Sequence, residues 1–286
     1  MINKTLKNWF SIPALWLGTW KMWWHPDVEF APDQKYIDDI RRSIDIWITL
    51  IDTAEIYADW HCEELVWKAI KNYSRRDLFI ISKVFKNHLH YEDLIKALEN
   101  TLDRLWTDYL DLYLIHAPNP EVDIKETMEA MNFLYDKWLI KNIGVSNFKK
   151  ETLEIAQSFS NAKIVLNQCH YNLIFREPEI SWLNEYCQNN DIIMQAWRPL
   201  QYWEIASPQN DILKSLSQKY SKTYSQIALN RLISQCNITT LTKMSTADHI
   251  KENLWSIGWE MEPEDIELLK KNYPNQKIYS SSYPLG

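Results

Sequence analysis

Residues 49–84 read TLIDTAEIYADWHCEELVWKAIKNYSRRDLFIISKV and contain the pattern that decides the fold. A short β-rich run, TLIDTA, is followed by a segment of helical length, CEELVWKAIKNY, and then by a second β-rich run, LFIISKV. A strand, a helix and a further strand in this order are typical of a βαβ unit with parallel strands. The stretch therefore predicts an α/β fold.

The same alternation continues along the chain, and most β-rich runs start about 30 residues after the one before, as successive βα units do. The runs cover residues 14–20, 49–54, 78–84, 109–117, 141–147, 163–169, 191–197 and 238–244. We expect these eight units to close into a (β/α)8 TIM barrel that forms one domain, residues 1–286, with a short N-terminal β-hairpin closing its bottom. A doubly wound open sheet is the alternative. It would need a Gly-rich phosphate turn after the first strand, and GTWKMWWHP does not supply one.

Composition restricts the class of partner. A net charge of −7 argues against general binding to nucleic acids or anionic membranes. No apolar run approaches the length of a membrane span, and the N-terminus lacks a signal-peptide core, so we expect a cytoplasmic protein. The four cysteines show no C-x-x-C pairing and are expected to be buried free thiols. His88 and His90 have no carboxylate or cysteine cluster beside them, and no metal site is expected.

Polar residues gather where the predicted strands end. In a parallel barrel, functional groups lie at the carboxyl ends of the strands. The residues at these ends are Gly18, Thr19, Trp20, Asp52, Lys83, His116, Ser146, Asn147, Gln168, Trp197 and Lys243.

Four residues from three consecutive units suggest a reaction: Asp52, Tyr57, Lys83 and His116. An isolated tyrosine phenol has a pKa near ~10 and is a poor acid at neutral pH. A neighbouring lysine ammonium lowers that pKa and makes Tyr57 a better proton donor, while Asp52 offsets the cost of burying Lys83. His116 could donate a hydrogen bond to a substrate oxygen. With no metal and no Ser or Cys nucleophile in view, this set suggests reduction of a carbonyl by a hydride donor.

Each of these residues alone has an ordinary explanation: a helix N-cap for Asp52, a surface lysine for Lys83, a satisfied core histidine for His116. Structural ion pairs also perturb titrating groups. The convergence of all four on one end of the barrel favours the catalytic interpretation.

The segments IDTAEIY, SKV, DRLWTDYLDLYLIHAP, IKNIGVSNF, NQCHYNL, AWRPL and IKENL together resemble the aldo-keto reductase family almost from end to end, in particular bacterial aldehyde and ketone reductases of the 2,5-diketo-gluconate reductase kind. The resemblance implies that Tyr57 is the proton donor, that Lys83 and Asp52 tune it, and that His116 orients the carbonyl. It also implies a nicotinamide cofactor, with NADPH favoured and NADH as the alternative.

The resemblance further assigns a set of cofactor contacts. Ser146, Asn147 and Gln168 match the residues that hold the nicotinamide carboxamide, and Trp197 matches the aromatic residue on which the ring stacks. The adenosine-phosphate end is expected at Lys243, which would bind the 2′-phosphate, and at Glu252 and Asn253, which match adenine contacts. His249 stands where many relatives carry Arg, and an imidazole grips phosphate weakly unless it is protonated. The complete predicted set is Gly18, Thr19, Trp20, Ser146, Asn147, Gln168, Trp197, Arg198, Pro199, Leu200, Lys243, Met244, Ser245, His249, Glu252 and Asn253.

The glycine and tryptophan contents are abnormal, with 4 Gly and 15 Trp, whereas glycine is usually about 7% of a chain. Aligned by motif, ten tryptophans fall where the family typically carries glycine: Trp9, Trp16, Trp23, Trp24, Trp47, Trp60, Trp67, Trp106, Trp138 and Trp203. Asn8-Trp9 is expected to be a two-residue hairpin turn with positive φ at both positions, and Trp47 and Trp138 are expected in the left-handed conformation after a helix. Some bacteria read the codon UGA as glycine, while others read it as tryptophan. We therefore expect UGA-encoded glycine at these positions, true tryptophan at 20, 197 and 259, and leave 182 and 255 undecided.

Two further functional classes stay open. One is a nicotinamide-nucleotide-binding regulatory or partner-docking module without turnover, although such a module has no need of Tyr57 as a proton donor. The other is a barrel enzyme acting on sugar phosphates, which would need a Gly-rich phosphate loop late in the barrel. The leading hypothesis is a monomeric, NADPH-dependent reductase of small aldehydes or ketones.

Overall fold

The computed structural model describes residues 2–20, 22, 33–201, 204–205, 210–243 and 246–286 of the chain. Of the positions singled out above, Met244, Ser245, Trp23, Trp24 and Trp203 lie outside the described residues.

Eight strands close into a barrel in the order β10-β3-β4-β5-β6-β7-β8-β9, which confirms the predicted (β/α)8 fold and rules out the open sheet. Each predicted run contains one strand, except that β8 ends one residue beyond its run, at His170. The strands are β3 (Leu15–Gly18), β4 (Leu50–Asp52), β5 (Phe79–Val84), β6 (Leu112–Ile115), β7 (Ile143–Ser146), β8 (Ile164–His170), β9 (Ile193–Trp197) and β10 (Ile238–Thr242).

Helices follow the strands along the chain. They are α1 (Asp33–Asp45), α2 (His61–Ile70), α3 (Tyr91–Leu105), α4 (Ile124–Asp136), α5 (Lys150–Phe159), α6 (Glu177–Ile180), α7 (Leu183–Asn189), α8 (Asp211–Tyr220), α9 (Tyr224–Ile233), α10 (Ala247–Leu254) and α11 (Pro263–Asn272), with 3-10 turns η1 (Arg75–Asp77) and η2 (Lys86–His88). In α3 the buried residues Leu94, Leu98, Leu102 and Leu105 recur every three or four positions, the period that places them on one helix face.

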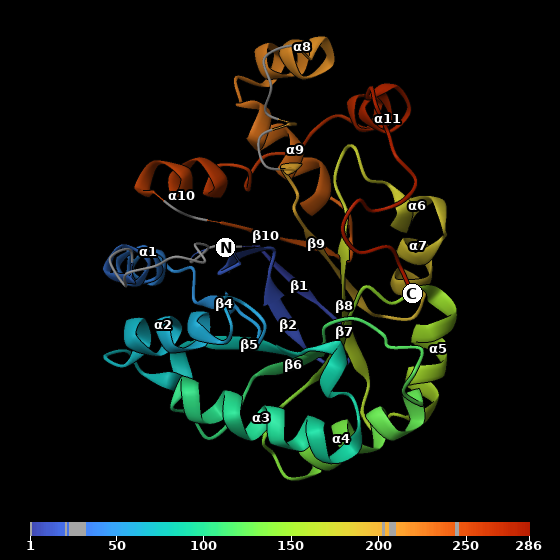
Figure 1. Ribbon diagram of the computed structural model, residues 1–286. Coiled ribbons are helices and arrows are strands. Elements are labelled where there is room, and N and C mark those ends of the chain that lie inside the picture. Colours follow the sequence, from blue (N-terminus) through green and yellow to red (C-terminus); the bar gives the residue numbers. More distant parts are fainter. Residues whose placement is uncertain (1, 21, 23–32, 202–203, 206–209, 244–245) are drawn as a thin grey trace. The chain divides into compact units, whose positions relative to one another are not determined.

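The chain forms two compact units, residues 16–167 with 243–247 and 286, and residues 1–15 with 168–242 and 248–285. In the first unit, helices α1–α5 lie around the outside of strands β4–β7 (Figure 1). Register pairs Gly18 with Asp52 and Lys83 with Leu114. In the second unit, β9 and β10 are parallel neighbours, and α8, α9 and α11 contribute Leu213, Ile227 and Leu269 to a buried apolar cluster.

The predicted N-terminal hairpin is present as β1 (Asn3–Thr5) and β2 (Ser11–Pro13), which pair antiparallel. The Lys4 ammonium donates to the carbonyls of Ile233 and Gln235, which precede β10, and the Lys7 amide donates to Asp191, which precedes β9. The hairpin therefore lies at the amino-terminal ends of these two strands.

The turn of this hairpin differs from the two-residue turn expected from Asn8-Trp9. Leu6 N–H donates to Phe10 O at 2.8 Å, and Trp9 N–H donates to Leu6 O at 3.0 Å. Only Trp9 has positive φ, 69°. The loop thus has three residues, a type that commonly ends in one left-handed residue. The prediction of positive φ was wrong for Asn8 and correct for Trp9.

Six tryptophans adopt a backbone conformation that glycine favours. Their φ values are 69° at Trp9, 71° at Trp47, 66° at Trp60, 50° at Trp106, 60° at Trp138 and 61° at Trp182. The predictions for Trp47 and Trp138 are confirmed, and Trp182, which the sequence left undecided, joins the set. Trp16 lies fully buried in β3 and Trp67 lies inside α2, so neither position requires positive φ.

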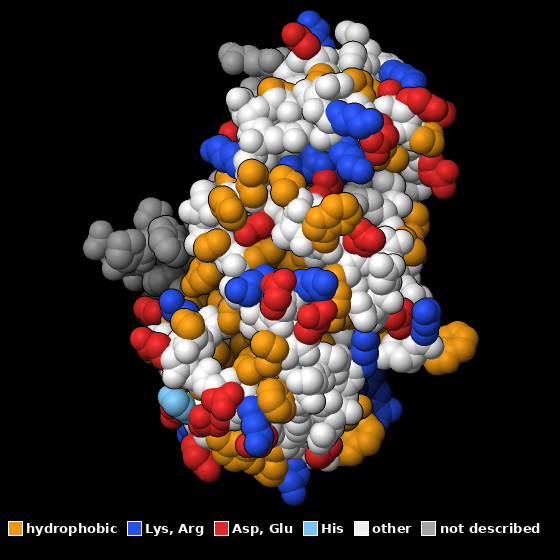
Figure 2. All heavy atoms as spheres, turned by 90° about the vertical axis from the view of Figure 1, so that its right-hand side faces the viewer, with side chains coloured by type: hydrophobic (Ala, Val, Ile, Leu, Met, Phe, Trp, Pro, Cys, Tyr) orange, Lys and Arg blue, Asp and Glu red, His pale blue; other side chains and the backbone are white. Residues whose placement is uncertain are grey.

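The surface carries both signs of charge. Figure 2 shows Lys and Arg side chains interspersed with Asp and Glu over one face of the molecule. Among the described residues, no helix is both long enough and apolar enough to cross a membrane. Cys62, Cys169 and Cys187 are buried free thiols as expected, whereas Cys236 is an exposed one, which corrects the prediction for that residue.

Candidate active site

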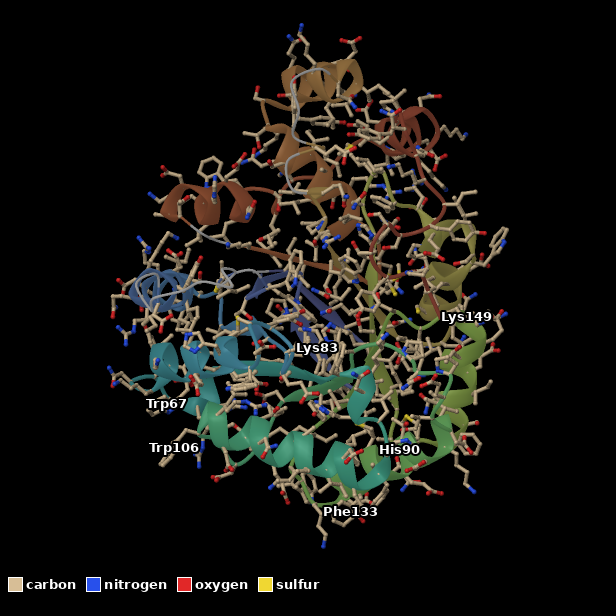
Figure 3. All side chains as sticks on the ribbon, viewed as in Figure 1. Trp67, Lys83, His90, Trp106, Phe133 and Lys149 are labelled. Atoms are coloured by element: carbon tan, nitrogen blue, oxygen red, sulfur yellow. The ribbon has the colours of Figure 1, made fainter. Side chains whose placement is uncertain are left out.

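Lys83 is the centre of the predicted catalytic group. It lies on β5, fully buried, and Figure 3 shows it among the strands while Trp67 and Trp106 lie at the outer edge on α2 and α3. Its ammonium donates to Asp52 Oδ1 at 2.7 Å, to the Thr53 carbonyl at 2.8 Å and to the Tyr57 hydroxyl oxygen at 3.2 Å. A lysine ammonium has three N–H donors, and these contacts account for all of them.

This arrangement fixes the role that the tyrosine hydroxyl can take. Because the Tyr57 oxygen accepts from Lys83, its own proton must point elsewhere. Burial lowers the pKa of Lys83, and the adjacent Asp52 carboxylate offsets part of that effect. A buried ammonium paired in this way stabilises negative charge on the phenol oxygen whenever the proton leaves.

His116 follows β6 and stands beside the phenol. Its ring centroid is 5.7 Å from that of Tyr57, and the rings meet edge to face at 80°. Phe85 makes a similar contact at 6.2 Å. Burial, with a smaller contribution from Lys83, lowers the pKa of His116 to about 3. The imidazole is therefore neutral at physiological pH and can donate one N–H.

Ser146 and Asn147 end β7, and both are buried. Asn147 has φ 63°, a left-handed conformation that Asn tolerates better than most residues. Its Nδ2 donates to the His116 carbonyl at 2.9 Å and to Ser146 Oγ at 3.0 Å. These bonds tie the ends of β6 and β7 together.

Gly18, Thr19 and Trp20 end β3. Gly18 pairs with Asp52 across the two strands, and Thr19 donates to the Asp52 carbonyl through both its amide and its hydroxyl, each at 3.0 Å. Trp20 is half-buried. These contacts hold the backbone from which the Asp52 carboxylate projects.

A second buried carboxylate lies behind β5 and was not predicted from the sequence. Glu63, in the first turn of α2, accepts from Ser82 Oγ at 2.5 Å and from Arg104 Nε at 2.6 Å. Burial raises the pKa of Glu63 against the opposing effect of Arg104. Glu63 anchors the neighbour of Lys83 on the strand, a role that depends on tertiary contacts rather than on a local motif.

Gln168 and Trp197 end β8 and β9 in the other compact unit. Gln168 is buried and Trp197 is half-buried. Trp197 stacks on His170, with centroids 4.2 Å apart and 10° between the planes. His170 was not predicted from the sequence, although period-two alternation on β8 places it on the same face as Gln168.

The segment after β9 contains the other predicted residues of this region. Arg198 has φ 52°, its guanidinium lies 5.1 Å from the Trp197 ring, and it bonds to Ser282. Pro199 is buried, and Leu200 packs against the apolar cluster of α8, α9 and α11.

The predicted adenosine-phosphate residues are also divided between the units. Lys243 is exposed, and its ammonium lies 5.5 Å from the Tyr36 ring of α1, a contact that the sequence did not indicate. His249 is half-buried on α10. On the same helix, Glu252 accepts from Thr223 Oγ1 at 2.6 Å, and the buried Asn253 donates to Thr242 Oγ1 at 3.1 Å.

The structure thus brings Asp52, Tyr57, Lys83, His116 and Asn147 into one connected group. It places Trp197, Arg198 and His170 in a second group, and Glu252 and Asn253 on one helix. Each unit carries one feature that suits part of a nicotinamide nucleotide: Trp197 offers a planar ring in one unit, and Lys243 offers an exposed positive charge in the other.

Comparison with known proteins identifies relatives over nearly the whole chain. The model of the aldo/keto reductase family matches residues 14–273. The glyoxal reductase of Bacillus subtilis is 32% identical over 275 residues, which cover 96% of this chain and 93% of that protein.

Solved structures agree with this match. The thermostable aldo-keto reductase Tm1743, in complex with the inhibitor epalrestat, superposes with a TM-score of 0.90 at 40% identity, covering 94% of this chain and 98% of that one. An aldo-keto reductase from Klebsiella pneumoniae in complex with NADPH superposes with a TM-score of 0.85 at 31% identity, covering 97% and 98% of the two chains.

Proposed function

Because the chain belongs to the aldo/keto reductase family of oxidoreductases, we propose that it reduces small aldehydes and ketones to alcohols with NADPH, and that Tyr57 is the general acid. The observation that carries the proposal is the contact of 3.2 Å between the Lys83 ammonium and the Tyr57 hydroxyl oxygen.

NADPH, when bound, supplies the hydride that adds to the carbonyl carbon. As the carbonyl π bond breaks, the substrate oxygen takes the proton of Tyr57. The phenolate left behind is stabilised by Lys83, whose charge Asp52 holds in place at 2.7 Å. Neutral His116 donates a hydrogen bond to the same substrate oxygen and so fixes the carbonyl for attack.

The proposed cofactor contacts are given for each compact unit by itself. In the first unit, Ser146 and Asn147 would hold the carboxamide, and Lys243 would pair with the 2′-phosphate, which favours NADPH over NADH. In the second unit, Gln168 would hold the carboxamide, Trp197 would offer a stacking face to the nicotinamide, and Glu252 and Asn253 would bind adenine. The relative that binds NADPH supports this choice.

Tyr57→Phe tests the assignment. This variant keeps the ring and removes the proton, so kcat should fall by about 100-fold or more, with the Kd for NADPH nearly unchanged. Tyr73→Phe, which removes a hydroxyl bonded to Asp45 outside the site, is the matched control and should behave as the parent. Carbonyl reduction by Tyr57→Phe at the parental rate would disprove the role of Tyr57.

The substrate range is tested by NADPH oxidation with a panel of small aldehydes and ketones. Glyoxal belongs in it because a relative carries that activity in its name. Tight NADPH binding without turnover on every member would support the nucleotide-binding module instead. The same preparation should elute as a monomer in size-exclusion chromatography. In the source cells it should be found in the cytoplasm, where the free thiols stay reduced.

A further inference from the structure

Three aromatic rings form a continuous stack beside the proposed nicotinamide platform. His170 lies between Phe175 and Trp197, with centroid distances of 4.2 Å to each ring and interplanar angles of 26° and 10°. Both His170 and Phe175 are buried. Trp197 therefore has an aromatic ring packed against one of its faces.

Hydrogen bonds at both nitrogens fix the orientation of the middle ring. Ser280 Oγ lies 2.7 Å from His170 Nδ1, and the amides of Ser282 and Tyr283 donate to that same oxygen. Because Ser280 Oγ accepts both amide protons, its own proton goes to Nδ1. Nε2 then carries the ring proton and donates to Gln201 Oε1 at 2.9 Å.

The charge state of the ring agrees with this geometry. Burial lowers the pKa of His170 to about 4, against a smaller raising effect of the bond to Gln201. At physiological pH the ring is neutral, so it adds no positive charge next to Trp197.

We propose that His170 is a positioning residue that fixes the plane of Trp197 and thereby the plane on which the nicotinamide ring lies. The inference rests on the proposed function, in which Trp197 stacks on nicotinamide. It extends that function to a residue that touches neither substrate nor cofactor. The segment around Ser280 takes part because it fixes the His170 ring.

Calorimetric titration of two ligands separates positioning from general support of the fold. NADPH carries the nicotinamide, whereas 2′,5′-ADP carries the adenosine phosphates alone. His170→Ala should raise the Kd for NADPH about tenfold, which is the size of one or two ring contacts. It should leave the Kd for 2′,5′-ADP within about twofold of the parental value. His170→Phe keeps a flat ring, so its Kd for NADPH should stay within about threefold of the parental value. His90→Ala removes an exposed histidine that is hydrogen-bonded to Glu126, and it should change the Kd for neither ligand.

Equal weakening of both ligands by His170→Ala would show a structural role only, and an unchanged Kd for NADPH would also overturn the inference. His170→Leu fills the space without an aromatic face and replaces His170→Ala should that variant not fold. A parent protein that binds NADPH and reduces carbonyls leaves the proposed function intact in either case. A parent that binds no NADPH overturns both.

A separate inference follows from the backbone of the tryptophans. The six residues with φ between 50° and 71°, Trp9, Trp47, Trp60, Trp106, Trp138 and Trp182, are 53% to 86% exposed. In this conformation a β-carbon crowds the backbone, which is why glycine prevails there. A mostly exposed indole has limited packing contact to offset that strain, although the Trp106 ring does contact the Trp67 ring at 6.1 Å between centroids. Trp106 is the left-handed C-cap of α3, the kind of position where glycine is commonest.

We infer that the codons for these six residues are read as glycine in the source organism, as UGA is in some bacteria. The inference is independent of the family resemblance, because it rests on φ and exposure, and it agrees with the content of 4 Gly and 15 Trp.

Mass spectrometry of the protein from its source tests this directly. Peptides from residues 43–68 should carry glycine at 47 and 60, and tryptophan at both positions would overturn the inference. In recombinant protein, Trp60→Gly, Trp106→Gly and Trp138→Gly should each raise the Tm by a few degrees. Trp67→Gly is the matched control: it lies inside α2 with ordinary helical φ, so glycine there should lower the Tm. No gain in Tm from any of the three glycines would count against the strain on which the inference depends.

Discussion

At the scale of single residues, Lys83 shows how burial and hydrogen bonding assemble the proposed catalytic group from ordinary side chains. The sequence placed Asp52, Tyr57, Lys83 and His116 at strand ends, and that was enough to predict their proximity. The sharing of one ammonium among a carboxylate, a carbonyl and a phenol could not be predicted, because the Thr53 carbonyl is a backbone group with no sequence signature.

Lys83→Met separates the chemical role of this residue from its structural role. Leaving Asp52 buried without its partner should lower the free energy of unfolding by about 3–5 kcal/mol, and kcat should fall by about 100-fold or more. In the double variant Lys83→Met, Asp52→Asn, the Tm should largely recover while kcat should not. Thermal melts and NADPH oxidation measure the two effects. Recovery of both would mean that Lys83 acts only through stability.

The aromatic stack around His170 could not be predicted from the sequence. Its neighbours Gln168 and Trp197 were found by motif, but a stack depends on residues distant in sequence, such as Phe175 and Ser280. Strand alternation alone could have suggested that His170 faces the same way as Gln168.

At the scale of elements, strand positions followed from the β-rich runs, and the segment CEELVWKAIKNY, expected to be helical, contains nearly all of α2. The hairpin turn was the exception. Loop length depends on the register of the strands: Thr5 lies opposite Ser11 and Leu6 pairs with Phe10, so three residues remain in the loop. The dipeptide Asn8-Trp9 alone does not specify this loop length.

The amino-terminal ends of β5, β6 and β7 are held by one carboxylate, which gives a prediction for stability. This carboxylate is Asp111, at the end of the barrel opposite the proposed site. It accepts from Ile80 N–H at 2.9 Å and pairs with Arg75 at 2.8 Å and with Lys141 at 3.3 Å. Asp111→Ala should lower the free energy of unfolding by about 3 kcal/mol or more, since it leaves Arg75 without its carboxylate partner and the buried Ile80 N–H without its acceptor. Lys141→Ala, at a more exposed position, should cost about 1 kcal/mol or less. Urea titrations compare the two, and equal losses would contradict the central role of Asp111.

At the scale of the whole molecule, two buried imidazoles make stability depend on pH. The folded-state pKa values of His116 and His170 are about 3 and about 4, below the value near 6.5 for an exposed histidine. Between these limits the unfolded chain binds more protons than the folded one, so stability falls as pH drops from about 6.5 towards 4. His170→Phe should therefore lose less stability than the parent between pH 6.5 and pH 4.5 in urea titrations. His90→Ala should follow the parent, and identical curves for His170→Phe and the parent would contradict the low pKa of His170.

The closed barrel takes strands from both compact units, so neither unit has a complete sheet alone. We therefore expect the single domain predicted from the sequence to unfold in one calorimetric transition, which NADPH shifts to higher temperature. Two separated transitions, with only one shifted by NADPH, would show independently folding parts.

In the proposed reaction, the phenol oxygen stays beside the same ammonium after it gives up its proton, so the same groups would also support the reverse reaction. By microscopic reversibility, the anionic form of Tyr57 would take the proton of an alcohol along the same path by which the neutral form would give one to a carbonyl. The cell then sets the net direction of flux through the relative supply of reduced and oxidised cofactor, and alkaline conditions favour alcohol oxidation.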